Sequence, residues 1–202
     1  MLTYSEEEKL WNEGYEVVCG VDEAGRGPLC GPVAAAACIL PAGLVIEGLN
    51  DSKKLTAKKR DLLFDEIKEK AVSYCVMLGS VEEINETDIL AATLHTMRRA
   101  IEGLSVKPDA ALIDGNITKG FSLPARAVVH GDAISPSIAA ASILAKVTRD
   151  RICEELDEKY PQYGIAKHKG YGTKAHMEAL RKYGPCEIYR TKFIRFLNDE
   201  KQ

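Results

Sequence analysis

The chain has 202 residues, of which 46% are hydrophobic and 28% are charged, and its formal net charge is -3. This length and apolar content suffice for one compact domain with a small appendage. The nearly balanced charge argues against a protein that coats nucleic acid without specificity, although it leaves room for a local basic patch.

The cysteines and the N-terminus exclude several further classes. The six cysteines form no C-x-x-C pair, so neither a zinc site nor a disulfide framework is indicated. Glu6, Glu7 and Glu8 stand where a signal peptide requires an apolar core, and no apolar run is long enough to span a membrane. We therefore expect a cytoplasmic protein with reduced thiols and no membrane association.

The predicted elements alternate between strands and helices. A capping-box pattern, Ser5-Glu6-Glu7-Glu8, predicts that a short helix begins at Ser5. After it the patterns predict, in chain order, a strand hairpin over 16–22 and 33–40, a helix over 56–71, a strand over 74–78, and a helix in two pieces over 81–102. There follow strands over 110–114 and, more weakly, 126–130, a helix from Ser135-Pro136 to about 160, and helices over 174–183 and 187–198.

This order of elements predicts an α/β fold with a mixed sheet flanked by helices. The last part of the chain shows a helix-only pattern and is expected to form C-terminal helices. We accordingly divide the chain into a main domain over 1–157 and a helical extension over 158–202.

Two aspartates close predicted strands. Asp22 ends the first strand and Asp114 ends a later one, where an open α/β sheet usually presents ligand-binding groups. Glu23 directly follows Asp22. Because neighbours on a regular strand point to opposite faces, these two carboxylates can reach one metal centre only if the strand bends. Asp132 precedes the N-terminus of a helix, so a helix cap is an alternative to a site role for it.

Carboxylates without histidine or cysteine partners favour Mg²⁺ or Mn²⁺ over zinc. In two-metal sites, one such ion lowers the pKa of the attacking water while the other stabilises the leaving oxygen of a phosphoryl group. This chemistry leaves three classes open: a nuclease, a nucleic-acid-binding module without turnover, and a phosphatase for small molecules. The acidic quartet favours catalysis, and the basic and tyrosine-containing segments favour a polymer as substrate.

A glycine-rich loop, Gly25-Arg26-Gly27-Pro28-Leu29-Cys30-Gly31, follows the first two carboxylates. Its spacing differs from a dinucleotide-binding fingerprint, and Pro28 removes an amide that would hold a phosphate. Because glycine lets a backbone approach a ligand closely, the loop suits contact with a nucleic-acid sugar and phosphate.

Basic residues cluster at Lys53-Lys54, at 58–60 and at 167–169, and Tyr171 follows the last group. Cationic and aromatic residues at such spacing suit a groove that follows a nucleic-acid backbone and stacks a base. We assign 58–60 to a solvated helix face. Lys146, Arg149 and Arg151 fit ordinary surface charges as well as substrate contacts.

Four stretches together resemble ribonuclease HII. They are Val21-Asp22-Glu23-Ala24-Gly25-Arg26-Gly27-Pro28, then Asp51-Ser52-Lys53-Lys54-Leu55, then Gly131-Asp132 with the run 137–150, and finally 163–173. They occur in the family's order and span roughly residues 17 to 193. The resemblance implies an RNase H-like fold, with a catalytic domain over 1–157 and a helical extension over 158–202 that contributes to substrate binding.

The resemblance also implies roles for particular residues. The catalytic metal ligands would be Asp22, Glu23, Asp114 and Asp132. The loop that senses the ribose 2′-hydroxyl would be Gly25, Arg26 and Gly27, and Tyr171 would stack at the RNA-to-DNA step. We complete the predicted substrate-binding set with Lys53, Lys54, Lys146 and Lys169. The implied reaction, with Mg²⁺ or Mn²⁺, cuts the RNA strand of RNA–DNA hybrids. It also cuts 5′ to ribonucleotides embedded in duplex DNA, leaving 3′-hydroxyl and 5′-phosphate ends.

Three departures from the family pattern limit what the resemblance implies. His130 stands where the family more often has lysine. The usual His-Arg-x-Ser-Phe is only loosely matched by Ile188-Tyr189-Arg190-Thr191-Lys192-Phe193, so the resemblance leaves the role of this segment open. The chain has no clear clamp-binding Q-x-x-L/I/M-x-x-F/Y-F/Y segment. The expected partner is therefore nucleic acid alone, and the expected state is a monomer.

Overall fold

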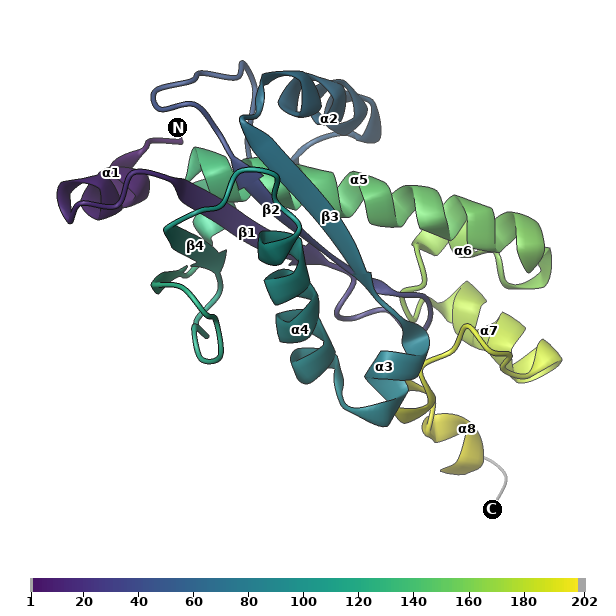
Figure 1. The fold of residues 1–202 in the computed structure, drawn as a ribbon. Helices are drawn as coiled ribbons and strands as arrows, with labels where there is room; N and C mark the ends of the chain where they lie inside the picture. The colour runs from purple at the N-terminus through teal and green to yellow at the C-terminus, as the bar shows by residue number, and fades with distance from the viewer. Residues whose placement is uncertain (1, 200–202) are drawn as a thin grey trace.

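The computed structural model describes residues 2–199, which form a five-stranded sheet in the order β3-β2-β1-β4-β5 (Figure 1). The strands are β1 (Val18–Ala24), β2 (Val33–Ile39), β3 (Ser73–Gly79), β4 (Ala110–Asp114) and β5 (Ala125–Val128). The β1, β2 and β3 strands pair antiparallel, whereas β4 pairs parallel with both β1 and β5. The predicted mixed sheet is thereby confirmed.

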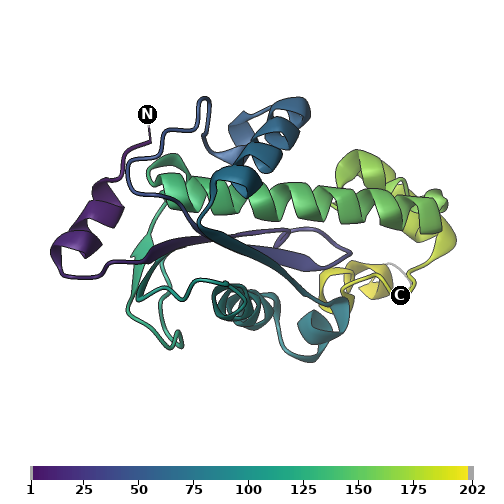
Figure 2. The same cartoon turned by 45° about the horizontal axis from the view of Figure 1, so that its top comes forward.

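Helices cover both faces of the sheet. Figure 2 shows α5 (Pro136–Lys159) and α2 (Ala57–Lys70) on one face and α4 (Ile89–Glu102) on the other. Alternate residues of β2 point to opposite faces of the sheet. Ala34 and Ala36 pack in the apolar core beneath α5, whereas Ala35 and Ala37 pack in the apolar core beneath α4. Small side chains at these positions let the helices lie close to the sheet.

The backbones of β1 and of the start of α5 lie close together at Gly20. A Cβ atom at Gly20 would stand 2.2 Å from the backbone carbon of Ser137. The absence of a side chain at this position therefore sets the depth at which α5 packs, and α5 carries several side chains of the site described below.

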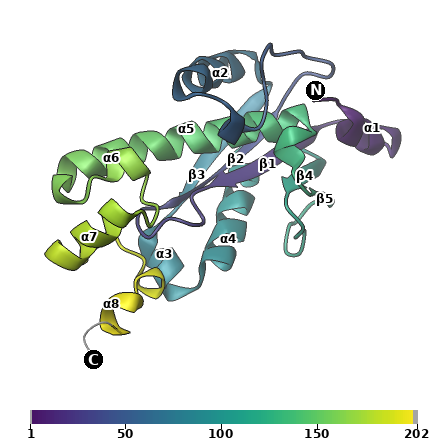
Figure 3. The ribbon, with the colours of Figure 1, turned by 180° about the vertical axis from the view of Figure 1, so that it is seen from behind.

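Most of the remaining helices lie toward the two ends of α5, whereas the helix over 81–86 lies beside α4, as the view from behind shows (Figure 3). The remaining helices are α1 (Ser5–Asn12), α3 (Val81–Glu86), α6 (Ile165–His168), α7 (Lys174–Tyr183) and α8 (Phe196–Asp199), with short 3-10 turns η1 (Ser52–Lys54), η2 (Gly131–Ala133), η3 (Pro161–Tyr163) and η4 (Thr191–Phe193). A separate apolar cluster joins Tyr163, Leu180 and Tyr189 to Cys153 of α5. This cluster places the C-terminal segments beside the glycine-rich loop.

The structure corrects three local predictions. The helix α1 is capped by Tyr4 without a side-chain hydrogen bond, so Ser5 is not the cap of a capping box. The strand β1 continues past Asp22 to Ala24. The helix predicted over 187–198 is wrong in its first half, because Tyr189 forms a β-bridge with Cys30 instead.

Two expectations from composition were tested by the structure. All six cysteines are free, and four of them are buried. Among residues 2–199, no helix has both the length and the apolar character needed to cross a membrane.

Candidate active site

A cavity of about 440 Å³ opens at the ends of β1 and β4, beside α5. It brings together three of the predicted carboxylates and six of the eight predicted substrate-binding residues. The lining residues used below are Asp22, Glu23, Gly25, Arg26, Gly27, Lys53, Arg60, Asp114, Ser142, Lys146 and Tyr171. Segments far apart in the sequence therefore meet at one hollow, as the motifs predicted.

Asp22 and Glu23 share this cavity although they lie on a regular strand. The β1 strand stays paired with β2 through Ala24, whereas its pairing with β4 stops at Val21. Both carboxylates thus lie just beyond the last pair with β4, where the edge of β1 is open. Asp22 is buried and accepts a hydrogen bond from the backbone nitrogen of Glu23 at 2.7 Å. The open edge takes the place of the bend that we expected.

Asp114 links the end of β4 to the turn that carries Asp132. Its Oδ1 atom accepts a hydrogen bond from the backbone nitrogen of Gly131 at 2.7 Å. The helix-cap alternative for Asp132 is wrong, because Ser135 caps α5 by accepting from the backbone nitrogen of Ile138. Asp132 is 4% exposed, and within the described residues its Oδ2 atom is buried without a hydrogen-bond partner.

Burial and mutual repulsion raise the pKa of three of these carboxyl groups. For Asp22 the largest cause is burial, followed by the charges of Glu23 and Asp114. Burial also raises the pKa of Glu23, and the positive charge of Arg26 acts in the opposite direction. The pKa of Asp132 is raised by burial against the opposing charge of Lys53. Burial, together with repulsion between neighbouring carboxylates, therefore disfavours the ionised forms of these groups when no metal ion is bound.

These features fit a hard divalent cation. All four candidate donors are carboxylates, and the buried Oδ2 atom of Asp132 accepts no hydrogen bond within the described residues, with the ammonium group of Lys53 3.5 Å away as an ion pair. Within residues 2–199, however, no three histidine, cysteine, aspartate or glutamate side chains stand close enough together to hold an ion. Carboxylates repel one another when no cation lies between them. The four carboxylates can therefore each donate to a metal ion, but they do not form a preformed cage.

The glycine-rich loop and Tyr171 also line the cavity. Gly25 has a φ of +97°, a conformation that favours glycine. A Cβ at Gly27 would lie 3.3 Å from Cε1 of Tyr171, so the ring packs directly against the loop. The ring is nevertheless 47% exposed, and the backbone nitrogen of Leu29 donates to the carbonyl of Gly170 at 2.8 Å. An exposed ring on a fixed backbone suits stacking.

The predicted basic residues divide into two groups. Lys53 and Lys146 line the cavity. Lys54 lies outside it and pairs with Asp51 at 3.8 Å. Lys169 lines a neighbouring hollow of about 310 Å³ and pairs with Glu154 at 2.8 Å.

Two buried arginines donate hydrogen bonds to the backbone of the glycine-rich loop. The sequence patterns predicted this role for neither of them. Arg149 is 1% exposed, so its assignment as a possible surface charge is wrong. Its guanidinium donates to the carbonyls of Cys30, Pro32 and Lys169. It thereby ties the glycine-rich loop to the segment that carries Tyr171.

Arg190 is fully buried and holds more of the loop. It donates at 2.7–3.1 Å to the carbonyl oxygens of Gly25, Arg26, Pro28, Gly31 and Pro32. Burial and the neighbouring charge of Arg149 lower the pKa of Arg190 to about 10. The available signal was the arginine in the loose match to His-Arg-x-Ser-Phe. The same contacts explain why residues 187–190 are not helical.

Solved structures share this fold. The chain resembles ribonuclease H2 from Pyrococcus horikoshii OT3, with a TM-score of 0.76 and 28% identity over 92% of this chain and 98% of that one. It also resembles the structure of the PCNA:RNase HII complex from Archaeoglobus fulgidus, with a TM-score of 0.73 and 27% identity over 88% and 95% of the two chains. The fold and the acidic cavity define a nuclease of the ribonuclease H type.

Sequence comparison specifies the family. The family model "Ribonuclease HII" matches residues 19–196. A ribonuclease HII from Caldicellulosiruptor bescii is 53% identical over 189 residues, which cover 94% of this chain and 92% of that protein. The chain belongs to the ribonuclease HII family.

Family membership confirms the predicted fold and the prediction of an enzyme. Ribonucleases of this type are nucleases and hydrolases that depend on divalent metal ions. The alternatives of a binding module without turnover and of a small-molecule phosphatase are therefore not retained.

Proposed function

We propose that the chain is an endonuclease that hydrolyses the RNA strand of RNA–DNA hybrids. We further propose that it cuts 5′ to ribonucleotides embedded in duplex DNA and leaves 3′-hydroxyl and 5′-phosphate ends. The observation that carries the proposal is one cavity lined both by the carboxylates Asp22, Glu23 and Asp114 and by Gly25, Arg26, Gly27 and Tyr171. The 2′-hydroxyl distinguishes RNA from DNA, and a site built to bind a hydroxyl rejects its absence by about 10⁴.

The carboxylates are proposed to hold Mg²⁺ or Mn²⁺ through Asp22, Glu23, Asp114 and Asp132. When bound, two such ions lower the pKa of an attacking water and stabilise the leaving oxygen. The chain's own part is to orient the scissile phosphate. Burial of Asp22 and its hydrogen bond from the Glu23 backbone hold that carboxylate in one orientation.

The other cavity residues are proposed to bind and orient the duplex. The loop of Gly25 to Gly27 contacts the ribose, Tyr171 stacks on the next sugar or base, and Lys53 and Lys146 bind backbone phosphates. Through Tyr171, the proposed C-terminal extension over 158–202 contributes to substrate binding. Selectivity then needs no contact with base edges.

Nucleic acid is the proposed partner of this chain, and a monomer is its proposed working state. The Archaeoglobus fulgidus relative is described in a complex with PCNA. The absence of a clear clamp-binding motif is the reason why we do not extend that partner to this chain. Light scattering of the purified chain tests the monomer, and a cytoplasmic location stays a prediction.

The proposal is tested with an end-labelled DNA duplex that carries one ribonucleotide, incubated with Mg²⁺ or Mn²⁺. Cleavage is expected on the 5′ side of the ribonucleotide, and a full RNA–DNA hybrid is expected to be cut as well. An all-DNA duplex of the same sequence is the matched control. Asp22→Asn is expected to abolish cleavage while duplex binding survives. No cleavage of either substrate with either ion would overturn the proposal.

A further inference from the structure

Arg60 of α2 is not part of a solvated helix face, contrary to the assignment of residues 58–60. Its side chain is only 15% exposed. One guanidinium nitrogen, Nη1, donates to the carbonyl of Ser52 at 3.1 Å and to that of Leu55 at 2.6 Å. The other, Nη2, lies 3.7 Å from Oδ2 of Asp150 on α5. Arg60 therefore connects the turn over 51–55 to α5.

The turn is fixed at a second point on α5. The Ser52 hydroxyl shares a buried hydrogen bond of 2.9 Å with the hydroxyl of Ser142, which lines the active-site cavity. Within the turn, Asp51 accepts from the backbone nitrogen of Lys53 at 2.9 Å. Ser142 thus holds the turn at Ser52, and Arg60 holds it at Ser52 and Leu55, on either side of Lys53 in the sequence.

Lys53 is the exposed end of this arrangement. Its side chain is 77% exposed, and its Nζ atom lies 3.5 Å from Oδ2 of Asp132. An ammonium group at the rim of an acidic cavity can bind an anion that approaches from solvent. The anion that nucleic acid presents at every step of its backbone is phosphate.

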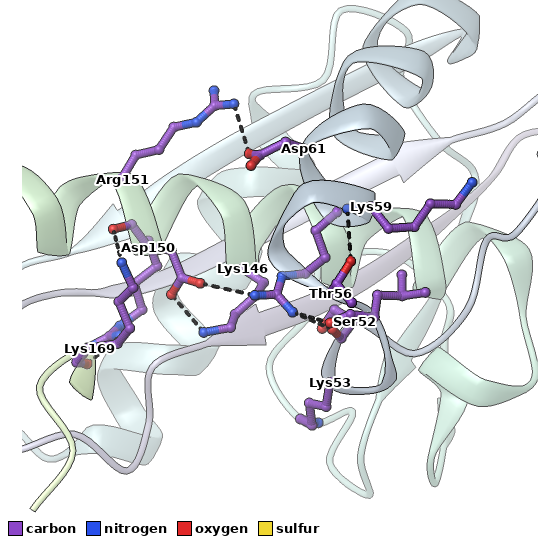
Figure 4. A network of polar contacts seen from close by, with 12 residues as sticks. Ser52, Lys53, Thr56, Lys59, Asp61, Lys146, Asp150, Arg151 and Lys169 are labelled. Atoms are coloured by element: carbon purple, nitrogen blue, oxygen red, sulfur yellow. Dashed lines mark hydrogen bonds and ion pairs between the residues drawn. The ribbon is translucent and has the colours of Figure 1, made fainter. Parts of the chain in front are cut away.

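Asp150 joins Arg60 to a second cation of the cavity. Figure 4 shows the Asp150 carboxylate paired with Lys146, near the turn that carries Ser52 and Lys53. Its Oδ1 atom accepts from Lys146 at 2.7 Å while its Oδ2 atom faces Arg60. One carboxylate therefore orients two cations from different helices.

The contacts of Arg60 suit a residue that supports the turn over 51–55 and does not itself bind the substrate. Its guanidinium already faces two carbonyls and a carboxylate, so few of its donors remain for a ligand. A planar guanidinium can span these three acceptors, whereas an ammonium group acts as a point charge. Lysine is therefore a poor replacement at this position.

We propose that Arg60 is a positioning residue for substrate binding. It fixes the turn over 51–55 against Asp150, so that Lys53 binds a backbone phosphate beside the carboxylates. This inference rests on the proposed function, since it assumes a duplex in the cavity.

A double-mutant cycle tests the inference. KM and kcat for the single-ribonucleotide duplex are measured over a series of salt concentrations for the unmodified chain, Arg60→Met, Lys53→Ala and the double variant. Each single variant is expected to raise KM several-fold with little change in kcat, and to reduce the salt slope by about one phosphate contact. The double variant is expected to match Lys53→Ala, because Arg60 acts through that residue.

Two further variants control for charge. Lys59→Met removes a neighbouring cation whose ammonium group donates to the carbonyl of Glu47 at 3.4 Å, and it is expected to leave KM unchanged. Arg60→Lys keeps the charge without the planar guanidinium and is expected to behave like Arg60→Met. If Arg60→Met does not fold, Asp150→Asn removes the ion pair at nearly constant volume and should raise KM in the same direction.

Several outcomes overturn the inference. Additive effects in the double variant would mean that Arg60 binds substrate independently of Lys53. A lower Tm with unchanged KM and salt slope would show a purely structural role. An unchanged KM in Lys53→Ala would remove the phosphate contact and the role of Arg60 together. Failure of the proposed function is distinct, since the unmodified chain would then show no cleavage that depends on a ribonucleotide.

Discussion

Replacing Arg190 by methionine is expected to destabilise the chain and to weaken its selectivity for ribonucleotides. The change removes the donor to five loop carbonyls at a fully buried position. A hydrogen bond to a charged group contributes about 1.5–3 kcal/mol, and leaving its buried partner unsatisfied costs about 1–3 kcal/mol. The losses do not add, because the loop relaxes and water enters.

An opposing effect reduces the net change. Burial beside Arg149 disfavours the charged form of Arg190, as its lowered pKa shows, and methionine removes that cost. We therefore expect a net loss of about 3 kcal/mol in the free energy of unfolding. For a chain of this size, that loss corresponds to a fall in Tm of about 6–12 °C.

Calorimetry measures the stability, and cleavage of matched duplexes with and without a ribonucleotide measures the selectivity. Arg195→Met is the matched control, because Arg195 is an exposed arginine of the same segment and its loss should change stability by under about 0.5 kcal/mol. Arg190→Lys should fall between the two, since it keeps the charge with fewer donors. A Tm within about 1 °C of the unmodified chain, with unaltered selectivity, would refute the reasoning.

Three other predictions concern the ring, the carboxylates and the packing of α5. Tyr171→Ala should lower kcat/KM at RNA-to-DNA junctions by about tenfold or more, as expected for the loss of stacking, whereas Tyr171→Phe should not. If Tyr171→Ala cleaves these junctions as fast as the unmodified chain, the stacking role is wrong. Because the pKa of Asp22 is raised on folding, the folded state without metal binds a proton at this group more tightly than the unfolded state does. The contribution of this group to stability is therefore lost as the pH rises through the raised pKa of the folded state. Asp22→Asn should then raise Tm at neutral pH in chelator and flatten its pH dependence, and a lower Tm would contradict this. Gly20→Ala should destabilise by about 3 kcal/mol or more, because its Cβ meets the Ser137 backbone, and near-native urea unfolding would contradict the packing.

The sequence predicted those parts of the site that depend on local pattern. Asp114 closes an apolar strand, and the structure ends β4 at that residue. Asp132 was ambiguous because a carboxylate before a helix resembles a cap, and only the hydrogen bond of Ser135 resolves this. Glu23 was expected to need a bent strand, whereas the early end of the β1–β4 ladder, a tertiary feature, gives it access to the cavity.

The supporting arginines were beyond local pattern. Arg149, Arg190 and Arg60 contact backbone carbonyls, which every residue type possesses and which carry no signature in the sequence. For Arg190 the carbonyl partners lie 158–165 positions away along the chain. Such contacts arise only once the sheet, α5 and the C-terminal segments have packed together.

The grip of Arg190 on the loop has an electronic consequence. The carbonyl oxygens of Gly25 and Arg26 belong to the same peptide groups as the amides of Arg26 and Gly27. A cation at the oxygen end of a peptide polarises the whole group, so that its N–H becomes a stronger donor. The loop can thus offer a neutral hydroxyl an enhanced dipole without exposing the buried charge. Because salt screens buried charges weakly, discrimination between ribose and deoxyribose is expected to vary less with ionic strength than duplex affinity does.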